Sequence, residues 1–169
     1  QILTYRDALL HDRMISSVVI VGSGAIGIEF ASFYNDMGAK VTIIEMQEQI
    51  LPAEDADIAL SARKQFEKRG ITILTNASVS AVNAGEKGVT ISYEKDGKTA
   101  EVSCDVTVIA TGITGNIDGL NLDQAGVKTD NGHIVTDSSM TTNIAGVHAI
   151  GDVTGAPWLA HKASHEAVI

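Results

Sequence analysis

Three glycines stand at the spacing at which a backbone turn can hold a phosphate group. They lie within the run Val21-Gly22-Ser23-Gly24-Ala25-Ile26-Gly27-Ile28-Glu29. Gly22 would allow a tight turn, Gly24 would leave no side chain between the backbone and the phosphate, and Gly27 would let a helix pack closely on a strand. The free N–H groups at a helix start attract negative charge. The run therefore predicts a binding turn for a dinucleotide pyrophosphate.

A carboxylate follows at Glu45, roughly 20 residues beyond the glycines, where this type of site places an acid on the adenosine ribose. Such an acid accepts hydrogen bonds from ribose hydroxyls and repels a 2′-phosphate. Residues 46–49, Met-Gln-Glu-Gln, bring no arginine to bind that phosphate. The acid therefore favours NAD over NADP. A simpler alternative is an ordinary β–α turn with a surface glutamate after it, but glycines, flanking elements and acid agree on the first interpretation.

The elements that must position these groups read as a β–α–β unit. Residues 18–21 form a short apolar run typical of a buried strand, and a helix is expected from Ala25 to the Gly38-Ala39 pair. Residues 40–44 are β-branched enough to form the next parallel strand. The glycines therefore fall on the strand-to-helix turn, and Glu45 closes the second strand.

A second helix and a third strand are expected to extend the sheet. Asp55 or Asp57 can cap a helix that reaches Arg69 and stops at Gly70. The apolar face of that helix would carry Ile58, Ala62 and Phe66. Residues 71–74 then read as a third short parallel strand.

The pattern changes after residue 78 to alternating apolar and polar residues. Residues 79–82, 89–93 and 99–102 alternate in this way, and Asp96-Gly97 between the last two is a strong hairpin signal. These segments predict an antiparallel β-meander inserted in the α/β unit. The continuously apolar residues 106–110 would then return to the parallel sheet. The predicted fold class is thus α/β, with a Rossmann-like βαβ domain and an inserted meander.

The last third of the chain is rich in loops. Residues 133–135 and the apolar residues 147–150 are expected to be strands, the second ending at Gly151-Asp152. Pro157 suits the first turn of a helix, and residues 159–169 look helical. Asp152 lies at a strand end, where α/β folds bind ligands, although capping of a turn is the simpler role for an isolated aspartate.

Composition excludes several classes of function. The net charge of −9 argues against nucleic-acid binding, and no apolar run is long enough to span a membrane. Cys104 is the only cysteine, so disulfides and thiolate metal clusters are not expected, and no metal site is predicted. Cys104 is expected to be a buried structural thiol. Because the chain begins at Gln1 and stops within an apparent helix, we expect an excised segment of a longer protein.

Taken together, the motifs resemble the pyridine nucleotide-disulfide oxidoreductases, most closely the dihydrolipoyl dehydrogenase branch of that family. The resemblance runs along nearly the whole chain. It is carried by residues 3–9, 22–34, 41–45, 109–112 and 149–152, and most specifically by Leu159-Ala160-His161-Lys162-Ala163.

The resemblance implies roles in NAD binding. Gly22 to Glu29 would cradle the pyrophosphate and Glu45 would bind the adenosine ribose. Val79 would pack near the adenine, and the Gly112 backbone would lie along the nicotinamide half. Glu29 would sit near nicotinamide and flavin, with an ordinary helix glutamate as the alternative.

The resemblance also implies a partial FAD site. Asp152 would bond the flavin ribityl chain. The residues lining the isoalloxazine would be Trp158, Leu159, Ala160 and His161. A helix N-terminus aimed at the reduced flavin would stabilise its negative charge, so His161 matters for its backbone rather than as an acid or base.

The implied domains are a lead-in or linker at residues 1–14, an NAD-binding domain at 15–118 and a returning piece of the FAD domain at 119–169. The family's redox cysteine pair, glycine-rich FAD motif and His-Glu pair are not in this sequence. Residues 113–116, Ile-Thr-Gly-Asn, depart from the arginine and proline usual in relatives, which leaves local loop contacts open. No catalytic residue is therefore expected here, and the chain alone should bind NAD(H) without turnover.

The resemblance finally implies a setting. The parent protein would be a homodimer within a 2-oxo acid dehydrogenase complex. It would oxidise dihydrolipoamide on an acyltransferase lipoyl domain through a disulfide, FAD and NAD, in bacterial cytoplasm or, second, in the mitochondrial matrix. Two alternatives stay open: another NADH-linked flavin disulfide reductase, such as a mercuric reductase, and a noncatalytic dinucleotide-binding module.

Overall fold

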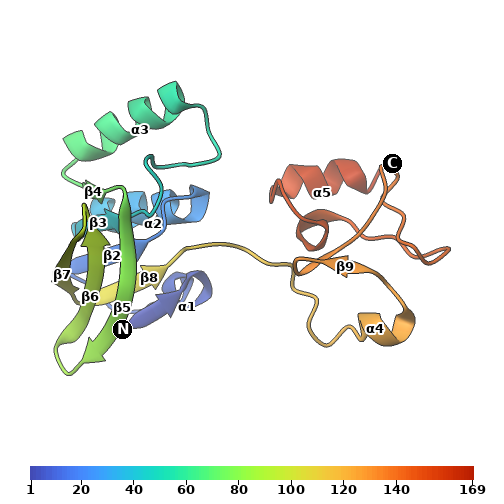
Figure 1. Cartoon of the computed structure of the whole chain (residues 1–169), viewed down its shortest axis with the longest axis horizontal. Coiled ribbons are helices and arrows are strands. Elements are labelled where there is room, and N and C mark those ends of the chain that lie inside the picture. The colour runs from blue at the N-terminus through green and yellow to red at the C-terminus, as the bar shows by residue number, and fades with distance from the viewer. The chain divides into compact units, whose positions relative to one another are not determined.

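The computed structural model describes residues 1–169, which fall into two compact units, Gln1–Gly112 and Ile113–Ile169 (Figure 1). A five-stranded sheet in the order β1-β8-β2-β3-β4 forms the centre of the first unit. All neighbouring strands in it run parallel. The strands are β1 (Ile2–Thr4), β2 (Ser17–Val21), β3 (Lys40–Ile44), β4 (Thr72–Leu74) and β8 (Val106–Ile109).

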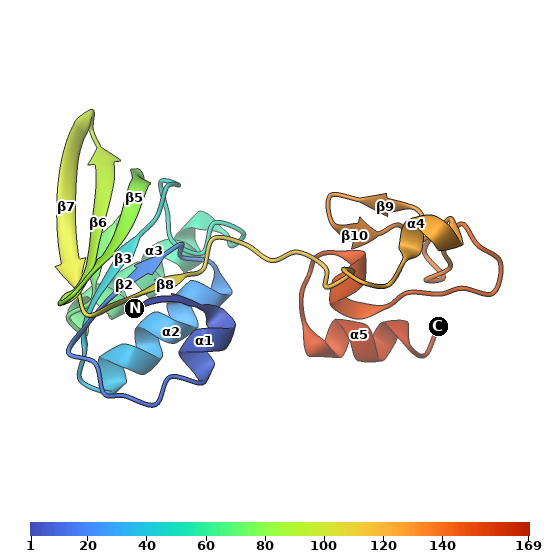
Figure 2. The ribbon, with the colours of Figure 1, turned by 90° about the horizontal axis from the view of Figure 1, so that it is seen from below.

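Alternate residues of β2 serve two different cores, because successive side chains of a strand point to opposite faces. Val18 and Ile20 pack with α2 (Ala25–Asp36), and the partly buried Phe66 of α3 (Ala56–Lys68) joins the same cluster. Val19 and Val21 pack with the meander instead. Figure 2 shows the helices and the meander on opposite sides of the sheet. The sheet is thus covered on both faces, as its unbroken apolar strands require.

The meander consists of β5 (Ala77–Gly85), β6 (Gly88–Lys95) and β7 (Lys98–Cys104), paired antiparallel in that order. Asp96 and Gly97 turn the chain between β6 and β7 with φ of +52° and +69°, as the predicted hairpin requires. The predicted α/β class, with a parallel sheet and an inserted antiparallel meander, is confirmed.

Cys104 ends β7 as a buried thiol, with 7% of its surface exposed. Burial, with a smaller contribution from the neighbouring Asp105 carboxylate, raises the pKa of the thiol. A raised pKa disfavours the thiolate, which is the reactive form. The expectation of a buried structural thiol is confirmed.

The first 15 residues contain more structure than the lead-in interpretation implied. Strand β1 pairs with β8, and α1 (Tyr5–Leu9) follows directly. Thr4 and Asp7 form a reciprocal capping box at the start of α1. Both elements are too short to show a periodic apolar pattern, which is why periodicity did not reveal them.

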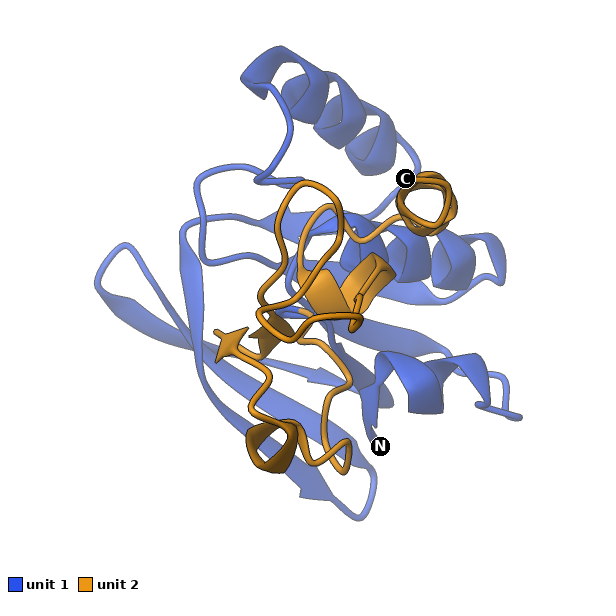
Figure 3. Ribbon diagram, turned by 90° about the vertical axis from the view of Figure 1, so that its right-hand side faces the viewer, with its two compact units in different colours: residues 1–112 blue, residues 113–169 orange.

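The second unit, orange in Figure 3, has a small core of its own. Val127, Ile134 and Ala149 are its buried apolar residues. Its elements are α4 (Leu122–Ala125), β9 (Thr129–Asp130), β10 (His133–Ile134), the 3₁₀ turn η1 (Gly151–Thr154) and α5 (Ala160–Glu166). Strands β9 and β10 pair antiparallel.

Two expectations about this unit were wrong. Residues 147–150 form no strand: one isolated bridge joins His148 to Thr141, and only Ala149 of the four is buried. Pro157 lies outside the helix, since α5 begins at Ala160. An apolar run becomes a strand only where a neighbouring strand pairs with it, and residues 147–150 have only the single bridge to Thr141.

The helix α3 begins and ends close to the predicted residues, but its inward face differs in detail. Ile58 is 57% exposed, whereas Ala59 is fully buried. Asp55 is the N-cap residue, yet its side chain makes no capping hydrogen bond. Ala62 and Phe66 pack against the main core as expected. None of the helices is both long and apolar enough to cross a membrane.

Candidate functional site

The glycine turn lies where the direction of the chain's crossovers reverses. From β2 the chain passes through α2 to β3, while β8 occupies the opposite side of β2. The carboxyl ends of β2 and β8 therefore face the same edge, with the backbone N–H of Ala110 donating to the Val21 carbonyl at 2.8 Å. Open α/β sheets bind ligands in the crevice at such a switch point.

The three glycines of the turn differ in the space that a side chain would have. Gly22 has φ +98°, and a Cβ there would overlap the Ala110 carbonyl. A Cβ on Gly27 would overlap the Gly22 carbonyl, so only glycine allows this closeness of helix and turn. A Cβ on Gly24 would meet nothing within 4 Å. Gly22 and Gly27 are therefore required by the fold, whereas Gly24 borders open space.

The start of α2 offers unused backbone donors beside that open space. Gly24 is the N-cap residue and supplies no side-chain cap. The first helical bond runs from Ile28 N–H to the Gly24 carbonyl at 3.0 Å, so the amides of residues 25–27 have no helical acceptor. They lie at the positive end of a 12-residue helix. This cradle, which a Cβ at Gly24 would partly fill, fits the phosphates of a dinucleotide.

Glu45 follows β3 and is bound by the turn itself. Only 7% of its surface is exposed. One carboxylate oxygen, Oε2, accepts from the Ser23 N–H at 2.8 Å and from the Ser23 hydroxyl at 2.7 Å. The other, Oε1, accepts from the Gln47 N–H at 2.8 Å. The carboxylate thus ties the glycine turn to the end of β3, and it presents its remaining acceptor position on Oε1.

Ser23 is the site residue whose partner the sequence did not indicate. Its side chain is fully buried and contacts Glu45. The sequence run placed Ser23 only as part of the pyrophosphate cradle. No sequence signal links a serine to an acid 22 positions away, because that contact depends on the pairing of β2 with β3.

The three other predicted residues of the first unit lie at separate places. Val79 is partly buried and packs with the cluster that contains Val21 and Ile44, on the meander side of the sheet. Glu29 is exposed on α2. Gly112 is exposed at the end of the first unit, just beyond Ala110 and Thr111, which approach Gly22.

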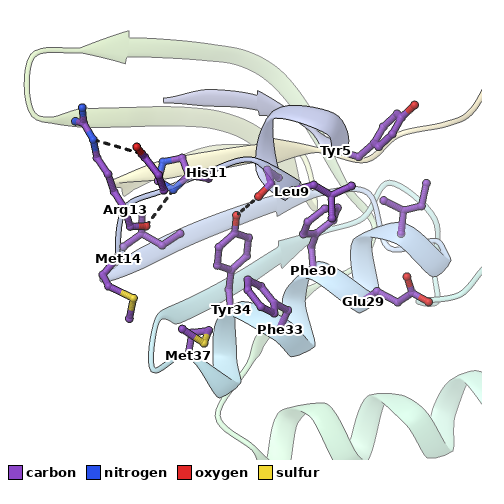
Figure 4. Close-up of a pocket in the computed structure, with 14 residues that line it drawn as sticks. Tyr5, Leu9, His11, Arg13, Met14, Glu29, Phe30, Phe33, Tyr34 and Met37 are labelled. Atoms are coloured by element: carbon purple, nitrogen blue, oxygen red, sulfur yellow. Dashed lines mark hydrogen bonds and ion pairs between the residues drawn. The ribbon is translucent and has the colours of Figure 1, made fainter.

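A hollow lies elsewhere, between α1, α2 and the loop after α1 (Figure 4). Its volume is about 670 Å³, and aromatic and apolar side chains such as Phe30, Phe33 and Met14 dominate its lining. Ile26 and Glu29 reach this hollow from the predicted cradle. Its walls bring together no nucleophile and base, so we do not assign chemistry to it.

The second unit carries the residues predicted to contact flavin. Asp152 is exposed on η1. The segment Trp158, Leu159, Ala160 and His161 is exposed around the start of α5. The Trp158 ring lies 6.0 Å from the His133 ring, centroid to centroid.

A buried ion pair on α5 fixes the turn that carries Asp152. The Lys162 ammonium donates to the Gly151 and Gly155 carbonyls and to the Thr154 hydroxyl, each at 3.1 Å. It also pairs with Glu166 at 3.1 Å, and the two side chains are only 15% and 12% exposed. Glu166 accepts from the Gly151 N–H at 2.7 Å. This backbone bond, followed by Lys162, lowers the pKa of Glu166.

No group of three His, Cys, Asp or Glu side chains is arranged to hold a metal ion. Near the predicted site residues, polar contacts gather at the glycine turn and around η1. Free helix-start amides can bind anions, and carboxylate oxygens can accept hydrogen bonds.

Comparison with known proteins agrees with this geometry. Residues 1–167 match the family described as pyridine nucleotide-disulphide oxidoreductase. The chain is 50% identical over 169 residues to a protein named dihydrolipoyl dehydrogenase from Rhizobium etli, covering 99% of the chain and 35% of that protein. It is 46% identical to one from Zymomonas mobilis, covering 99% and 36%.

Solved structures give the same result. An HOCl-induced flavoprotein disulfide reductase, RclA from Escherichia coli, in its Cu(II) complex, superposes with a TM-score of 0.87 at 28% identity, covering 98% of this chain and 38% of the other. LpdA from Mycobacterium tuberculosis superposes with a TM-score of 0.84 at 33% identity, covering 97% and 35%.

The chain spans about a third of the length of the curated relatives it matches. The match nevertheless includes both units, from the parallel sheet to α5. The chain belongs to the pyridine nucleotide-disulphide oxidoreductase family.

Proposed function

We propose that this chain is the NAD-binding portion of a flavin disulfide oxidoreductase of the dihydrolipoyl dehydrogenase type. One observation carries the proposal: the glycine turn opens onto unused amides at the switch point, with the buried Glu45 carboxylate held against the same turn. Relatives that share up to 50% identity over this region bear the name dihydrolipoyl dehydrogenase.

In this proposal the first unit binds and orients the nucleotide. The amides of residues 25–27 hold the pyrophosphate, and the Glu45 carboxylate accepts a hydrogen bond from a ribose hydroxyl. Val79 borders the adenine, Gly112 the nicotinamide half, and Glu29 lies toward the flavin. Bound NAD supplies the hydride acceptor, and none of these residues is assigned a bond-breaking role.

The second unit would contribute to the flavin site of the longer protein. Asp152 would hold the ribityl chain, and Trp158, Leu159, Ala160 and His161 would line the ring system. FAD supplies the electron relay between a disulfide and the nicotinamide. Residues 15–118 then constitute the NAD domain and residues 119–169 a returning part of the FAD domain, with residues 1–14 leading in.

The whole protein would oxidise dihydrolipoamide carried by a lipoyl domain and reduce NAD⁺. It would do so as a homodimer within a 2-oxo acid dehydrogenase complex in the bacterial cytoplasm. The chain by itself has no cysteine pair, since Cys104 is its single cysteine. We therefore expect nucleotide binding by the chain without turnover.

The test is a fluorescence titration of the purified chain with NADH and with NADPH. We expect NADH to bind more tightly, because the Glu45 carboxylate repels a 2′-phosphate. Glu45→Ala should cost about 1.5–3 kcal/mol of NADH binding, the range for a hydrogen bond to a charged group. Glu48→Ala is the matched control, because Glu48 is an exposed acid three positions away and should bind NADH like the wild type.

Equal binding of the two nucleotides, or no binding to a folded sample, would contradict the proposal. So would an unchanged NADH affinity after Glu45→Ala. Circular dichroism on each variant separates loss of binding from loss of fold, because Glu45 also anchors the turn.

A second candidate is another NADH-linked flavin disulfide reductase, which the superposition on the RclA reductase favours. Lipoamide reduction assayed on the longer protein containing this chain distinguishes the two. Turnover with lipoamide supports the first candidate, and turnover only with another disulfide or a metal ion supports the second. Nucleotide binding without any turnover supports a noncatalytic module.

A further inference from the structure

We propose that Ser23 is a positioning residue whose buried hydroxyl holds Glu45 and thereby sets the preference for NADH over NADPH. The inference deepens the proposed function and rests on it. It assigns the serine a task different from contact with the pyrophosphate.

The geometry of Ser23 separates it from the ligand. None of its surface is exposed, so its hydroxyl has no path to a phosphate or a ribose. The hydroxyl donates to Glu45 Oε2 at 2.7 Å, and the backbone N–H of the same residue donates to the same oxygen at 2.8 Å. Any effect of this side chain on nucleotide binding must therefore pass through the Glu45 carboxylate.

Hydrogen-bond donors hold the buried Glu45 carboxylate. Glu45 is 7% exposed and forms no ion pair with any lysine, arginine or histidine. Three donors surround the carboxylate in place of a cation: two from Ser23 and the Gln47 N–H. Buried polar groups need hydrogen-bond partners of this kind. The hydroxyl is the only one of the three that a side chain supplies.

The hydroxyl also determines which acceptor position faces the ligand. Both donors of Ser23 use Oε2, while Oε1 has a single donor. A carboxylate has about four acceptor positions, so the remaining one is on Oε1. An O–H···O⁻ bond is short and strong, and its loss would leave the carboxylate held by only two backbone donors, the Ser23 N–H on Oε2 and the Gln47 N–H on Oε1. A ribose hydroxyl would then meet an acceptor that is held less firmly in place.

The experiment measures dissociation constants of NADH and NADPH for the chain carrying Ser23→Ala or Ser23→Gly. Both variants lack the hydroxyl and keep the backbone N–H, so a shared effect belongs to the hydroxyl. We expect NADH binding to weaken by about three- to tenfold, as for one net hydrogen bond, with NADPH binding unchanged. The preference for NADH should fall by the same factor.

Combination with Glu45→Ala tests the route of the effect. If Ser23 acts through Glu45, Ser23→Ala should change NADH affinity less than twofold in the Glu45→Ala background. A purely structural serine would weaken binding equally in both backgrounds. Thr107→Val is the matched control: it removes another fully buried hydroxyl of the same sheet, which donates to the Val19 carbonyl, and should leave the preference unchanged.

The possible outcomes separate this inference from the proposed function. If the wild type binds neither nucleotide, the proposed function fails. If the wild type prefers NADH through Glu45 and both Ser23 variants match it, only the role of Ser23 is overturned. Tighter NADH binding by the variants would also overturn it, because the hydroxyl would then compete with the ribose. Unfolding of both variants would assign the hydroxyl to folding instead.

Discussion

Gly24 and Gly27 belong to one motif, yet the structure requires only one of them for folding. A Cβ on Gly27 would overlap the Gly22 carbonyl, whereas a Cβ on Gly24 would meet no atom within 4 Å. Gly24 has φ −65°, which any residue adopts. Its glycine is thus unexplained by the packing of the protein, and the proposed function would explain it by a ligand that approaches the backbone.

The two glycines should therefore respond differently to alanine. Gly24→Ala should leave the chain as stable as the wild type or up to about 1 kcal/mol more stable, because alanine reduces the freedom of the unfolded chain. It should weaken NADH binding at least tenfold. Gly27→Ala should lower the thermal unfolding midpoint. Thermal denaturation and NADH titration on both variants check this, and full NADH affinity in Gly24→Ala would refute the ligand explanation.

At the scale of residues, the sequence predicted Glu45 and the glycines of the turn, but not the hydrogen bond through Ser23 that joins them. Gly22, Gly27 and Glu45 follow from the chemistry of a known turn, which depends on residue type and spacing. The bond from the Ser23 hydroxyl to Glu45 depends on tertiary packing and has no distinctive residue pattern. Lys162 and Glu166 have the i,i+4 spacing of a helical ion pair, but their contacts with the Gly151 backbone depend on the fold.

At the scale of elements, predictability followed length and burial. The parallel strands β2 and β3 were predictable because both faces of the sheet are covered and their apolar runs are unbroken. Strand β1, which completes the sheet, has three residues and none of them is buried, whereas the equally short β4 contains the buried Ile73 and was predictable. The strand predicted from the apolar residues 147–150 was wrong, because Ala149 is the only one of them that enters the small core of the second unit.

The contact between α5 and η1 predicts how the stability of the second unit depends on pH. The Gly151 N–H and Lys162 lower the pKa of Glu166, so the folded second unit favours the charged form. A lowered folded pKa means that this stabilisation is complete above the ordinary glutamate pKa of about 4.3 and is lost as the pH falls through the lower folded value. We expect the stability advantage of the wild type over Glu166→Gln to be constant near neutral pH and to shrink in that acidic range.

Trp158 makes this measurable, since it is the only tryptophan and lies in the second unit. Denaturant unfolding followed by its fluorescence at a series of pH values gives the stability difference. Subtracting the unfolding free energy of Glu166→Gln from that of the wild type at each pH removes the contribution of Asp137. The pKa of Asp137 is also lowered, first by the Thr141 N–H. A difference that stays constant down to pH 2 would show that the ionisation of Glu166 does not contribute to stability.

At the scale of the whole molecule, two separate cores predict two separate responses to nucleotide. A ligand stabilises the state that binds it, by about 2.7 kcal/mol at 100 times its Kd. NADH should therefore slow amide exchange in the buried strands β2 and β3 of the first unit. The denaturant midpoint reported by Trp158 should not move. An equal shift in both signals would mean that the units unfold as one.

The place of β8 has a consequence for how the first unit is made. Strand β8 hydrogen-bonds to both β1 and β2, and Ile2 pairs with Thr107. Among the strands of this sheet the ribosome releases β1 first, but β1 has no neighbour in the sheet other than β8. It must wait until the meander and β8 have emerged, and the long loop then closed costs entropy that slows folding. The strand of this sheet that is synthesised first is therefore among the last to find its partner.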